Sequence, residues 1–523
     1  MSQVDSVNKL EKLSDGLVNA VDSVSIAEGS MDVDQLALDV VNAETEYTEA
    51  QYRKLRRKID LRLLPIMWLC YGTQQADKTG LSAQAIFGLQ EDTGLKGQEY
   101  AWLTTAFYLA YLVAEAPGNY FLQRAHMGWF LALVMSTWAI IVLCTGFTQN
   151  FAGLVSLRIL QGAAECTISP TFLLLTGMYY TSTEHTFRSI IWGTSSAGMK
   201  IIASLIEYGI GMYSEAHPGH LQPWRGISFF LGGLTFLCTI LVFFMLGSPR
   251  EVRWLSEDEK RMAMARVVGN QTGSDRHKRG EWKWDQVRGA FKDPQTYFFF
   301  ILSIVNALPV GGNNAFGNLV YKSFGFTSLE TLLEGDVPQQ AVSIIFFLVV
   351  GYTNTRYPGL RIYSMIISLI PAFIGMMVLA FIPRTSGHLW LLWGMYLMTV
   401  TGNLPGLLIW TMLPSNIAGR TKKSVVGTML FIGYCTGNSI APQMFQSSAA
   451  PKYISGLTAC AILYGLEILI MISWRCYYVW VNKRRDRQVA AMGLTADERE
   501  RQGHLNAEMD RTDTENIHFR YSF

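Results

Sequence analysis

Long apolar stretches recur along this chain and are separated by shorter polar connections. A helix needs about 20 predominantly apolar residues to cross a bilayer. The pattern therefore predicts an all-α polytopic membrane protein with twelve transmembrane helices in two groups of six. The expected spans are residues 62–85, 98–119, 127–148, 151–180, 189–212, 225–247, 295–321, 337–355, 361–383, 388–413, 424–447 and 453–481.

Polar segments divide the chain around these spans. Residues 1–50 hold eleven Asp or Glu against two Lys, which is typical of a disordered tail. We expect five parts: a disordered acidic cytosolic tail (1–52), an N-terminal six-helix half (53–247), a cytosolic central loop (248–294), a C-terminal six-helix half (295–482) and a cytosolic C-terminal tail (483–523).

Basic residues orient the predicted helices. Six Lys or Arg lie between Arg53 and Arg62, just before the first span, and eleven lie in the central loop. The connections on the other side carry about one each, such as Lys96 and Lys452. Because Lys and Arg accumulate on the cytosolic side of a membrane, both termini and the central loop are expected there.

Composition agrees with a membrane protein, since 50% of the residues are apolar and only 16% are charged. The seven cysteines fall in or beside apolar spans, which predicts buried thiols without disulfides. The eight histidines show no metal-ligand spacing, and no phosphate loop or nucleophilic triad stands out. We therefore expect no enzymatic activity, no cofactor, no bound metal and no nucleic-acid partner.

The most informative stretch is Phe151–Tyr180, whose only formal charges are Arg158 and Glu165. With Gln161, these side chains share one helix face, at spacings of three and seven. An ionisable group in a membrane helix is costly and usually faces the bundle interior or a wet cavity. The alternatives are a structural ion pair and a transport pathway, and spacing alone does not separate them.

Other charges within the predicted spans lie in the same half of the chain. Seven groups (Asp77, Lys78, Glu115, Arg158, Glu165, Lys200 and Glu207) sum to three positive and four negative charges, so one proton would neutralise the set. Glu165 is the first candidate for proton coupling, followed by Glu207 and Asp77. Arg158, Lys200 and Lys78 are candidates for binding an anion, since a guanidinium grips a carboxylate with two hydrogen bonds. A purely structural pairing is the alternative for each.

The second half offers amides and an aromatic residue. Asn313 and Asn314 follow Pro309 and adjoin Gly311-Gly312, which are expected to break the seventh helix locally. Further candidates for contact with a substrate are Trp410, Asn438 and Gln443. Amides that only join helices to one another are the alternative.

Several motifs resemble those of a known family. Arg158-Ile-Leu-Gln161-Gly162 resembles the fourth-helix motif of the major facilitator superfamily, whose halves are two six-helix repeats. The loops after the second and eighth helices depart from that superfamily, because both lack the usual Asp. More specific resemblances to the fungal anion:cation symporter family, in its allantoate permease branch, are Arg57–Pro65, Glu115–Asn119, Gly162–Glu165, Asn270–Gly273, Pro309–Gly312, Gly437–Gln443 and Asp513–Asn516 with Phe519–Tyr521.

This resemblance implies proton-coupled import of a small organic anion, such as a ureido acid or a vitamin carboxylate. The alternatives are a proton-antiport exporter of a metabolite or drug, and a transporter-like nutrient sensor. The fifth helix lacks the proline of the antiporter motif, which disfavours export. We expect a monomer in the plasma membrane, with protons, the anion and the bilayer as its partners.

Overall fold

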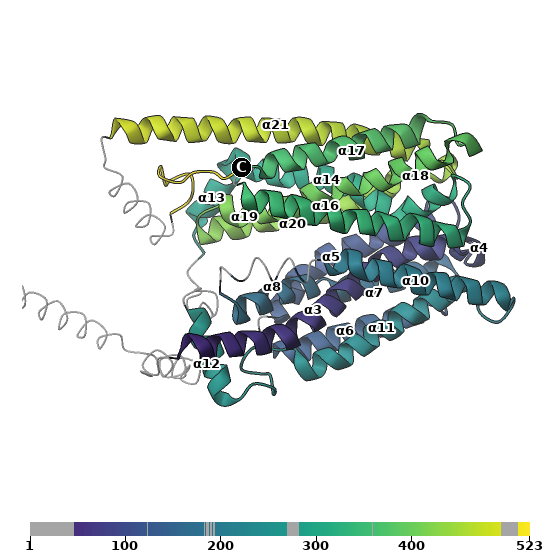
Figure 1. Cartoon of the computed structure of the whole chain (residues 1–523), viewed down its shortest axis with the longest axis horizontal. Coiled ribbons are helices and arrows are strands. Elements are labelled where there is room, and N and C mark those ends of the chain that lie inside the picture. The colour runs from purple at the N-terminus through teal and green to yellow at the C-terminus, as the bar shows by residue number, and fades with distance from the viewer. Residues whose placement is uncertain are drawn as a thin grey trace, which may run out of the picture.

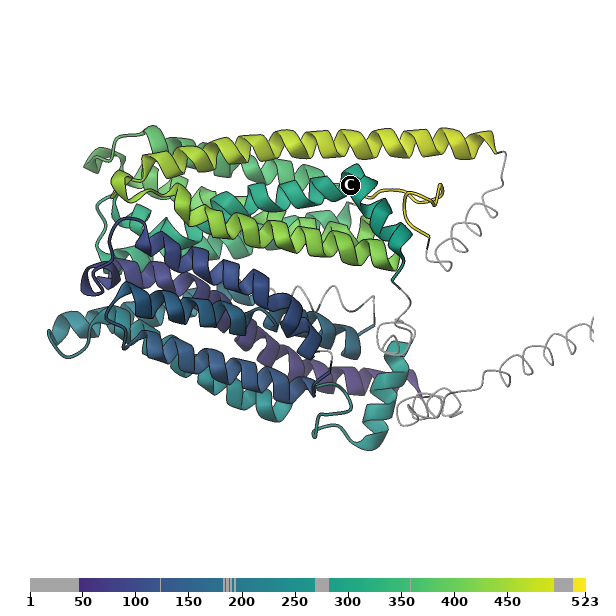
Figure 2. The same cartoon turned by 180° about the vertical axis from the view of Figure 1, so that it is seen from behind.

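The chain folds into two layers of long helices that run side by side (Figures 1 and 2). One layer contains α3 to α11, and the other contains α14 to α21. The computed structural model describes residues 47–122, 124–181, 184, 188, 191, 194–268, 282–357, 359–492 and 511–523. The expected disordered tail and Asn270–Gly273 therefore lie almost wholly or wholly outside the described residues.

The first layer holds the first six membrane helices. They are α3 (Glu49–Ile86), α5 (Glu99–Leu122), α6 (Met127–Thr145), α7 (Phe151–Glu165) continued by α8 (Ile168–Tyr179), α10 (Ser195–Ala216) and α11 (Pro223–Met245). A short helix, α4 (Leu89–Asp92), follows α3, and α12 (Glu257–Val268) follows α11.

The second layer holds the other six. After α13 (Trp284–Lys292) come α14 (Pro294–Lys322), α15 (Ser328–Glu330) with η1 (Thr331–Asp336) and α16 (Val337–Arg356), α17 (Arg361–Phe381), α18 (Leu389–Met398) with η3 (Thr399–Asn403) and α19 (Leu404–Asn416), α20 (Arg420–Ile440) and α21 (Ile454–Ala491). The short 3₁₀ turns η2 (Ser386–His388), η4 (Ala441–Met444) and η5 (Ser447–Ala449) lie in the connections.

Each of the twelve expected spans corresponds to one of these helices or helix groups, which confirms the predicted fold class. Seven of the described helices are long and apolar enough on their own to cross a bilayer. The membrane helices that do not reach this combination of length and hydropathy are α3, α5, α7 with α8, α10 and α20. Four of these five contain the ionisable residues noted in the sequence, and the fifth, α20, contains the buried Lys422. Ionisable side chains lower the hydropathy of a helix, and in a membrane protein they usually face the interior.

Two of the interruptions have a clear cause in proline. Pro170 has no N–H to donate to the carbonyl of Cys166, and α7 ends at Glu165, one residue before it. Pro338 likewise leaves the carbonyl of Glu334 free, and the indole N–H of Trp393 donates to it at 2.7 Å. That bond lies in the π-helical turn η1, at the start of the eighth span.

The predicted break in the seventh helix is wrong, because α14 runs through Pro309 without interruption. Gly311 and Gly312 serve close packing instead. A Cβ on Gly311 would lie 2.7 Å from the Asn438 side-chain oxygen, and one on Gly312 would lie 2.6 Å from the Phe445 ring. These glycines let α14 approach α20 and η4 closely.

The two halves meet along α3 with α14, α5 with α20, and α10 with α16. We call the side where α3 begins and α21 ends the tail side, and the side of α4 and η5 the far side (Figure 1). Toward the tail side the ribbons of the two layers diverge (Figure 2). Among the described residues, the hydrogen bonds between the halves lie toward the far side, as from Lys322 Nζ to the Ile86 carbonyl at 2.9 Å.

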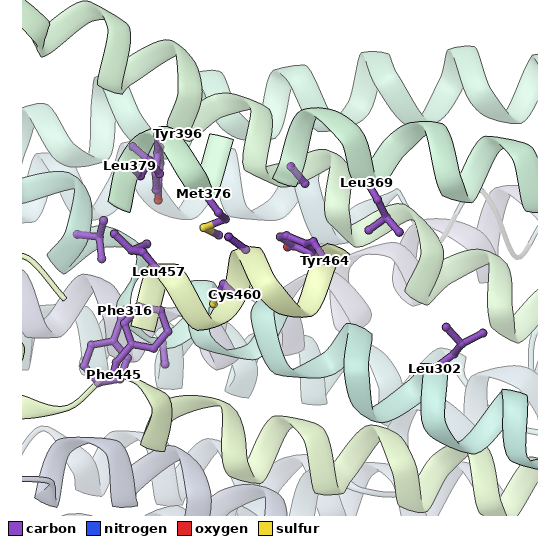
Figure 3. Close-up of a cluster of buried hydrophobic side chains, with 14 of the residues drawn as sticks. Leu302, Phe316, Leu369, Met376, Leu379, Tyr396, Phe445, Leu457, Cys460 and Tyr464 are labelled. Atoms are coloured by element: carbon purple, nitrogen blue, oxygen red, sulfur yellow. The ribbon is translucent and has the colours of Figure 1, made fainter. Parts of the chain in front are cut away.

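Two large clusters of buried apolar side chains fill the interior. One lies in the N-terminal half apart from Leu332, and the other lies mainly in the C-terminal half but also includes first-half side chains such as Leu81 and Tyr100. In the C-terminal half, Phe316 stacks on Phe445 with ring centroids 4.9 Å apart, near Leu457 (Figure 3). Met376, Leu379 and the other labelled side chains in Figure 3 continue this core, contributed by α14, α17, α18 and α21. Between membrane helices such contacts stabilise by close van der Waals packing, because lipid tails are as apolar as these side chains.

A further element closes the tail side of the C-terminal half. Residues 511–523 pack back on α20 and α21, and α21 itself continues to Ala491, beyond the expected boundary at residue 482. Lys422 Nζ lies 2.6 Å from an Asp293 carboxylate oxygen and 2.8 Å from an Asp513 oxygen, and all three side chains are fully buried. We call this the Lys422 cluster.

Candidate functional site

A cavity lies between the halves near the middle of the helices, and it has a volume of about 50 Å³. Arg158 of α7 and Lys78 of α3 line it from the first half, and Asn314 of α14 and Tyr434 of α20 line it from the second. Thus three of the residues predicted to bind substrate face one space, although they come from three different helices.

Arg158 is held by its own helix. Its Nη1 donates to the side-chain oxygen of Gln161 at 3.1 Å, and the Gln161 amide donates to a Glu165 carboxylate oxygen at 2.8 Å. The same amide also donates to Asp77 of α3. Gln161 therefore links the Arg158 guanidinium to both carboxyl groups. The link to Glu165 agrees with the shared helix face predicted from spacing, whereas the link to Asp77 of α3 was not predicted. We call Asp77, Arg158, Gln161 and Glu165 the central cluster.

Neighbouring helices brace the central cluster. The indole N–H of Trp138 in α6 donates to Asp77 at 2.8 Å, and the Gln74 amide donates to the Glu165 backbone carbonyl at 3.2 Å. Lys78 follows Asp77 in the helix but points elsewhere. Its ammonium lies 5.1 Å from the centre of the Tyr111 ring, within the range of a cation–π interaction. Lys78 thus faces the cavity, while Asp77 faces α6 and α7.

Gly162 explains how the motif residues reach this position. A Cβ at Gly162 would lie 2.2 Å from the backbone oxygen of Phe107 in α5. Only glycine allows α7 and α5 to approach this closely. The contact fixes the rotation of α7, and this rotation turns Arg158, Gln161 and Glu165 inward.

The central cluster keeps unused hydrogen-bonding capacity. All four of its side chains are at most 5% exposed. Yet Arg158 Nε and Glu165 Oε2 have no hydrogen-bond partner among the described residues, and neither does the side-chain oxygen of Gln74. A buried polar atom without a partner costs about 1–3 kcal/mol. The cluster can therefore accept a further polar group, or a proton, without breaking a bond.

A second charged group connects the halves. Lys200 Nζ of α10 lies 3.1 Å from an Asp336 carboxylate oxygen at the end of η1. The Asn318 amide donates to the other Asp336 oxygen at 3.1 Å. Glu207, two turns after Lys200 on the same helix, is also buried. The structure thus places Lys200 and Glu207 apart from the cavity lining, so the seven charges pooled in the sequence argument divide into separate groups.

The remaining candidates occupy different surroundings. Gln443 donates to the Thr105 hydroxyl across the halves at 2.9 Å, and Asn438 donates to the Tyr434 carbonyl of its own helix at 2.9 Å. Asn313 is half-buried beside Asn314, and Trp410 on α19 is 39% exposed. The cavity, as the described residues form it, is lined by none of these four.

Sequence reasoning missed Asp336 and the aromatic lining of the cavity. The eighth span was expected to begin at residue 337, which placed Asp336 in a loop one residue outside it. Tyr108 of α5 lies across from Tyr434 with ring centroids 6.1 Å apart, and both line the cavity. The signal that could have found Asp336 was Pro338, which favours a position within the first turn of a helix.

Comparison with known proteins agrees with this architecture. A sequence model of the Major Facilitator Superfamily matches residues 67–442. The allantoate permease of Saccharomyces cerevisiae is 31% identical over 498 residues, covering 92% of this chain and 88% of the permease. An uncharacterised transporter of Schizosaccharomyces pombe is 33% identical over 505 residues, covering 94% and 92% of the two chains.

Two proteins of lower sequence identity also match this chain. The thiamine pathway transporter of Saccharomyces cerevisiae is 27% identical over 474 residues, covering 90% of this chain and 86% of its own. A D-xylose–proton symporter shares the fold with a TM-score of 0.59 at 14% identity, covering 79% of this chain and 97% of the symporter. This chain is a membrane transporter of the major facilitator superfamily and belongs to its allantoate permease-like branch.

Proposed function

We propose that this transporter imports a small organic anion together with a proton, moving both from the far side to the tail side. The supporting observation is the cavity lined by Arg158 and Lys78 directly beside the buried carboxyls of Asp77 and Glu165. The basic residues at the start of α3 and in the central loop support a cytosolic tail side, since Lys and Arg accumulate on that side of a membrane.

Charge balance gives the reason for coupling. Asp77 and Glu165 with Lys78 and Arg158 sum to zero when all four are ionised. One proton on either carboxyl gives the site a charge of +1, which complements a monovalent anion. The anion and the proton then cross together without net charge, so the membrane potential no longer opposes anion uptake by about 2.3 kcal/mol per 100 mV.

Arg158 is suited to gripping the anion. Its Nη1 is already used by Gln161, whereas Nε has no partner within the described part of the chain. A carboxylate in the cavity would receive directional hydrogen bonds from the guanidinium and a point charge from Lys78. Gln161 links the guanidinium to Glu165, so protonation of Glu165 alters the hydrogen bonds that orient Arg158.

The size of the cavity limits what it holds in this conformation. A volume of about 50 Å³ corresponds to roughly three to five water molecules, at about 10–15 Å³ each. A carboxylate head fits this space, while a larger body requires the halves to separate. The relative named for allantoate and the relative named for the thiamine pathway support a ureido acid or a vitamin-like carboxylate as substrate.

The Lys200–Asp336 pair has a different part in this proposal. It joins α10 to η1 across the interface of the two halves. When the far side opens to admit substrate, these helices move apart and the pair separates. Glu207 provides a second carboxylate on α10. It can form an ion pair with Lys200 at that stage, so the ammonium group keeps an acidic partner.

The test is uptake of labelled organic anions by cells that express the protein, at acidic and at neutral external pH. We expect faster uptake at acidic pH, carried by wild type and by the control Glu215→Gln, which removes an exposed carboxylate. Glu165→Gln should lose the pH dependence. Efflux from preloaded cells, with no uptake of any anion tested, would contradict import and favour an exporter.

A further inference from the structure

A second hollow lies on the outer face of the C-terminal half, between α17 and α21, with a volume of about 500 Å³. Its walls are mostly carbon, contributed by side chains such as Ile366, Ile472 and Val479. Tyr363 and Trp480 lie at the tail-side end, and Trp480 is 58% exposed. Aromatic residues of this kind collect where a membrane meets water. We call this hollow the outer groove.

Two cations in the outer groove have no acidic partner among the described residues. Arg475 Nη2 donates to the Tyr363 hydroxyl at 2.7 Å, and its guanidinium lies over the rings of Tyr363 and Phe523 at 4.1 and 4.6 Å. Its Nη1 is buried and has no hydrogen-bond partner in the described ranges. No carboxylate of the described residues lies within 4.0 Å of Arg475 or of Lys483, which follows two turns later on the same helix.

An unpaired cation in an apolar groove is costly, and the cost falls when an anion supplies charge and hydrogen bonds. The aromatic rings lower that cost by cation–π contact but leave the charge unneutralised. The ligand must also cover the apolar walls that continue from the cations toward the middle of the membrane. An acyl chain joined to an anionic headgroup has both properties, whereas free phosphate has only the charge.

We propose that the outer groove is a binding site for an anionic glycerophospholipid of the tail-side leaflet. The phosphate binds Arg475, the negatively charged part of the headgroup reaches Lys483, and an acyl chain lies along Ile366 and Ile472. Zwitterionic lipids occupy the same space more weakly, because their own cation opposes the two side chains.

The protein carries its own reporter for this site. Of the seven cysteines, only Cys144 and Cys476 are exposed, and Cys476 lies in the outer groove. In a Cys144→Ser background, maleimide labels Cys476 alone among the exposed thiols. We expect phosphatidylserine nanodiscs to slow that labelling several-fold relative to phosphatidylcholine nanodiscs. Native mass spectrometry of the wild type should show phosphatidylserine retained in preference to phosphatidylcholine.

Variants make the test specific. Arg475→Gln/Lys483→Gln should abolish the difference between the two lipids, and Lys483→Gln alone should reduce it if the double variant does not fold. Arg53→Gln/Arg57→Gln removes the same charge from exposed tail-side positions of α3 and should keep the difference. Equal labelling rates in both lipids would overturn the proposal. Loss of the difference in the control variant, or equal protection by inorganic phosphate, would also overturn it.

Discussion

The central cluster and the Lys422 cluster are both buried groups of charged side chains, but they differ in whether every polar side-chain atom has a hydrogen-bond partner. In the Lys422 cluster the ammonium bonds two carboxylates, and the Tyr521 hydroxyl donates to the remaining Asp513 oxygen at 2.7 Å. Within the described chain, none of its polar side-chain atoms lacks a partner, whereas Arg158 Nε and Glu165 Oε2 of the central cluster have none.

This difference separates a structural role from a transport role. Breaking a complete buried ion pair leaves uncompensated charge and costs about 3–5 kcal/mol. The central cluster already contains buried polar atoms without hydrogen-bond partners among the residues that the structure describes. Binding of substrate or a proton can supply those partners and so stabilise the cluster. The exposed fraction of the side chains does not distinguish the two clusters, because it is close to zero in both.

The largest expected effect is on folding, from Lys422→Met. This change leaves Asp293 and Asp513 buried together without a cation. We expect the loss of about 3–5 kcal/mol of stability, seen as failure to recover monodisperse protein in detergent. A normal thermal unfolding temperature for this variant would remove the distinction between the two clusters.

The next largest effect is on transport, from Arg158→Lys. The variant keeps the charge but loses the planar fork that bonds Gln161 and the anion. We expect uptake to fall about 10-fold or more, equivalent to about 1.4 kcal/mol, while the thermal unfolding temperature changes little. A variant that unfolds early but transports normally when folded would assign Arg158 a structural role.

The Lys200–Asp336 pair gives an intermediate effect. Asp336→Asn leaves the Lys200 ammonium without its partner, so uptake should fall several-fold. Lys200→Met/Asp336→Asn removes both charges and should recover part of that loss, because no unpaired charge remains. A loss in the double variant equal to the product of the losses of Asp336→Asn and Lys200→Met alone would show that the two residues act independently.

A smaller effect concerns pH and lies at the tail side. Burial alone would raise the pKa of the Glu184 carboxyl, but hydrogen bonding to Arg56 and the charge of Arg266 hold this pKa below its usual value. Its stabilisation is therefore present above the unfolded pKa and is lost as pH falls through the folded pKa. Glu184→Gln should flatten the acid side of the stability profile by about 1 kcal/mol at most, measured by thermal unfolding across pH.

The smallest effect is expected from Arg520→Gln. The ion pair of Arg520 with Asp486 at 2.8 Å joins residues 511–523 to α21, and its side chains are 34% and 62% exposed. Exposed pairs contribute about 0.2–1 kcal/mol, so the unfolding temperature should change by only a few degrees. A loss as large as that of Lys422→Met would show that exposure does not explain the contrast.

Features that depend on spacing within one helix could be predicted from the sequence. Arg158, Gln161 and Glu165 share a face as expected. The alternation of apolar stretches with polar connections predicts the twelve spans, although only seven of the described helices reach a membrane-spanning hydropathy alone. Contacts between helices far apart in the chain could not be predicted. Lys200 pairs with Asp336, 136 residues later, and Gly311 packs against Asn438 instead of breaking its helix. A proline followed by glycines can either break a helix or allow it to pack closely against another helix. The local sequence is the same in both cases, so the outcome depends on the neighbouring helix.

The Lys422 cluster can form only late in the synthesis of the chain. Asp293 precedes Lys422 by 129 residues, but Asp513 follows it by 91. When α20 enters the membrane, the ribosome has not yet made the second carboxylate or Tyr521. Since chains fold from the N-terminus as they emerge, the tail-side base of the C-terminal half stays incomplete until residues 511–523 are released. A chain truncated before Asp513 would carry all its membrane helices and still expose an unfinished polar site to cellular quality control.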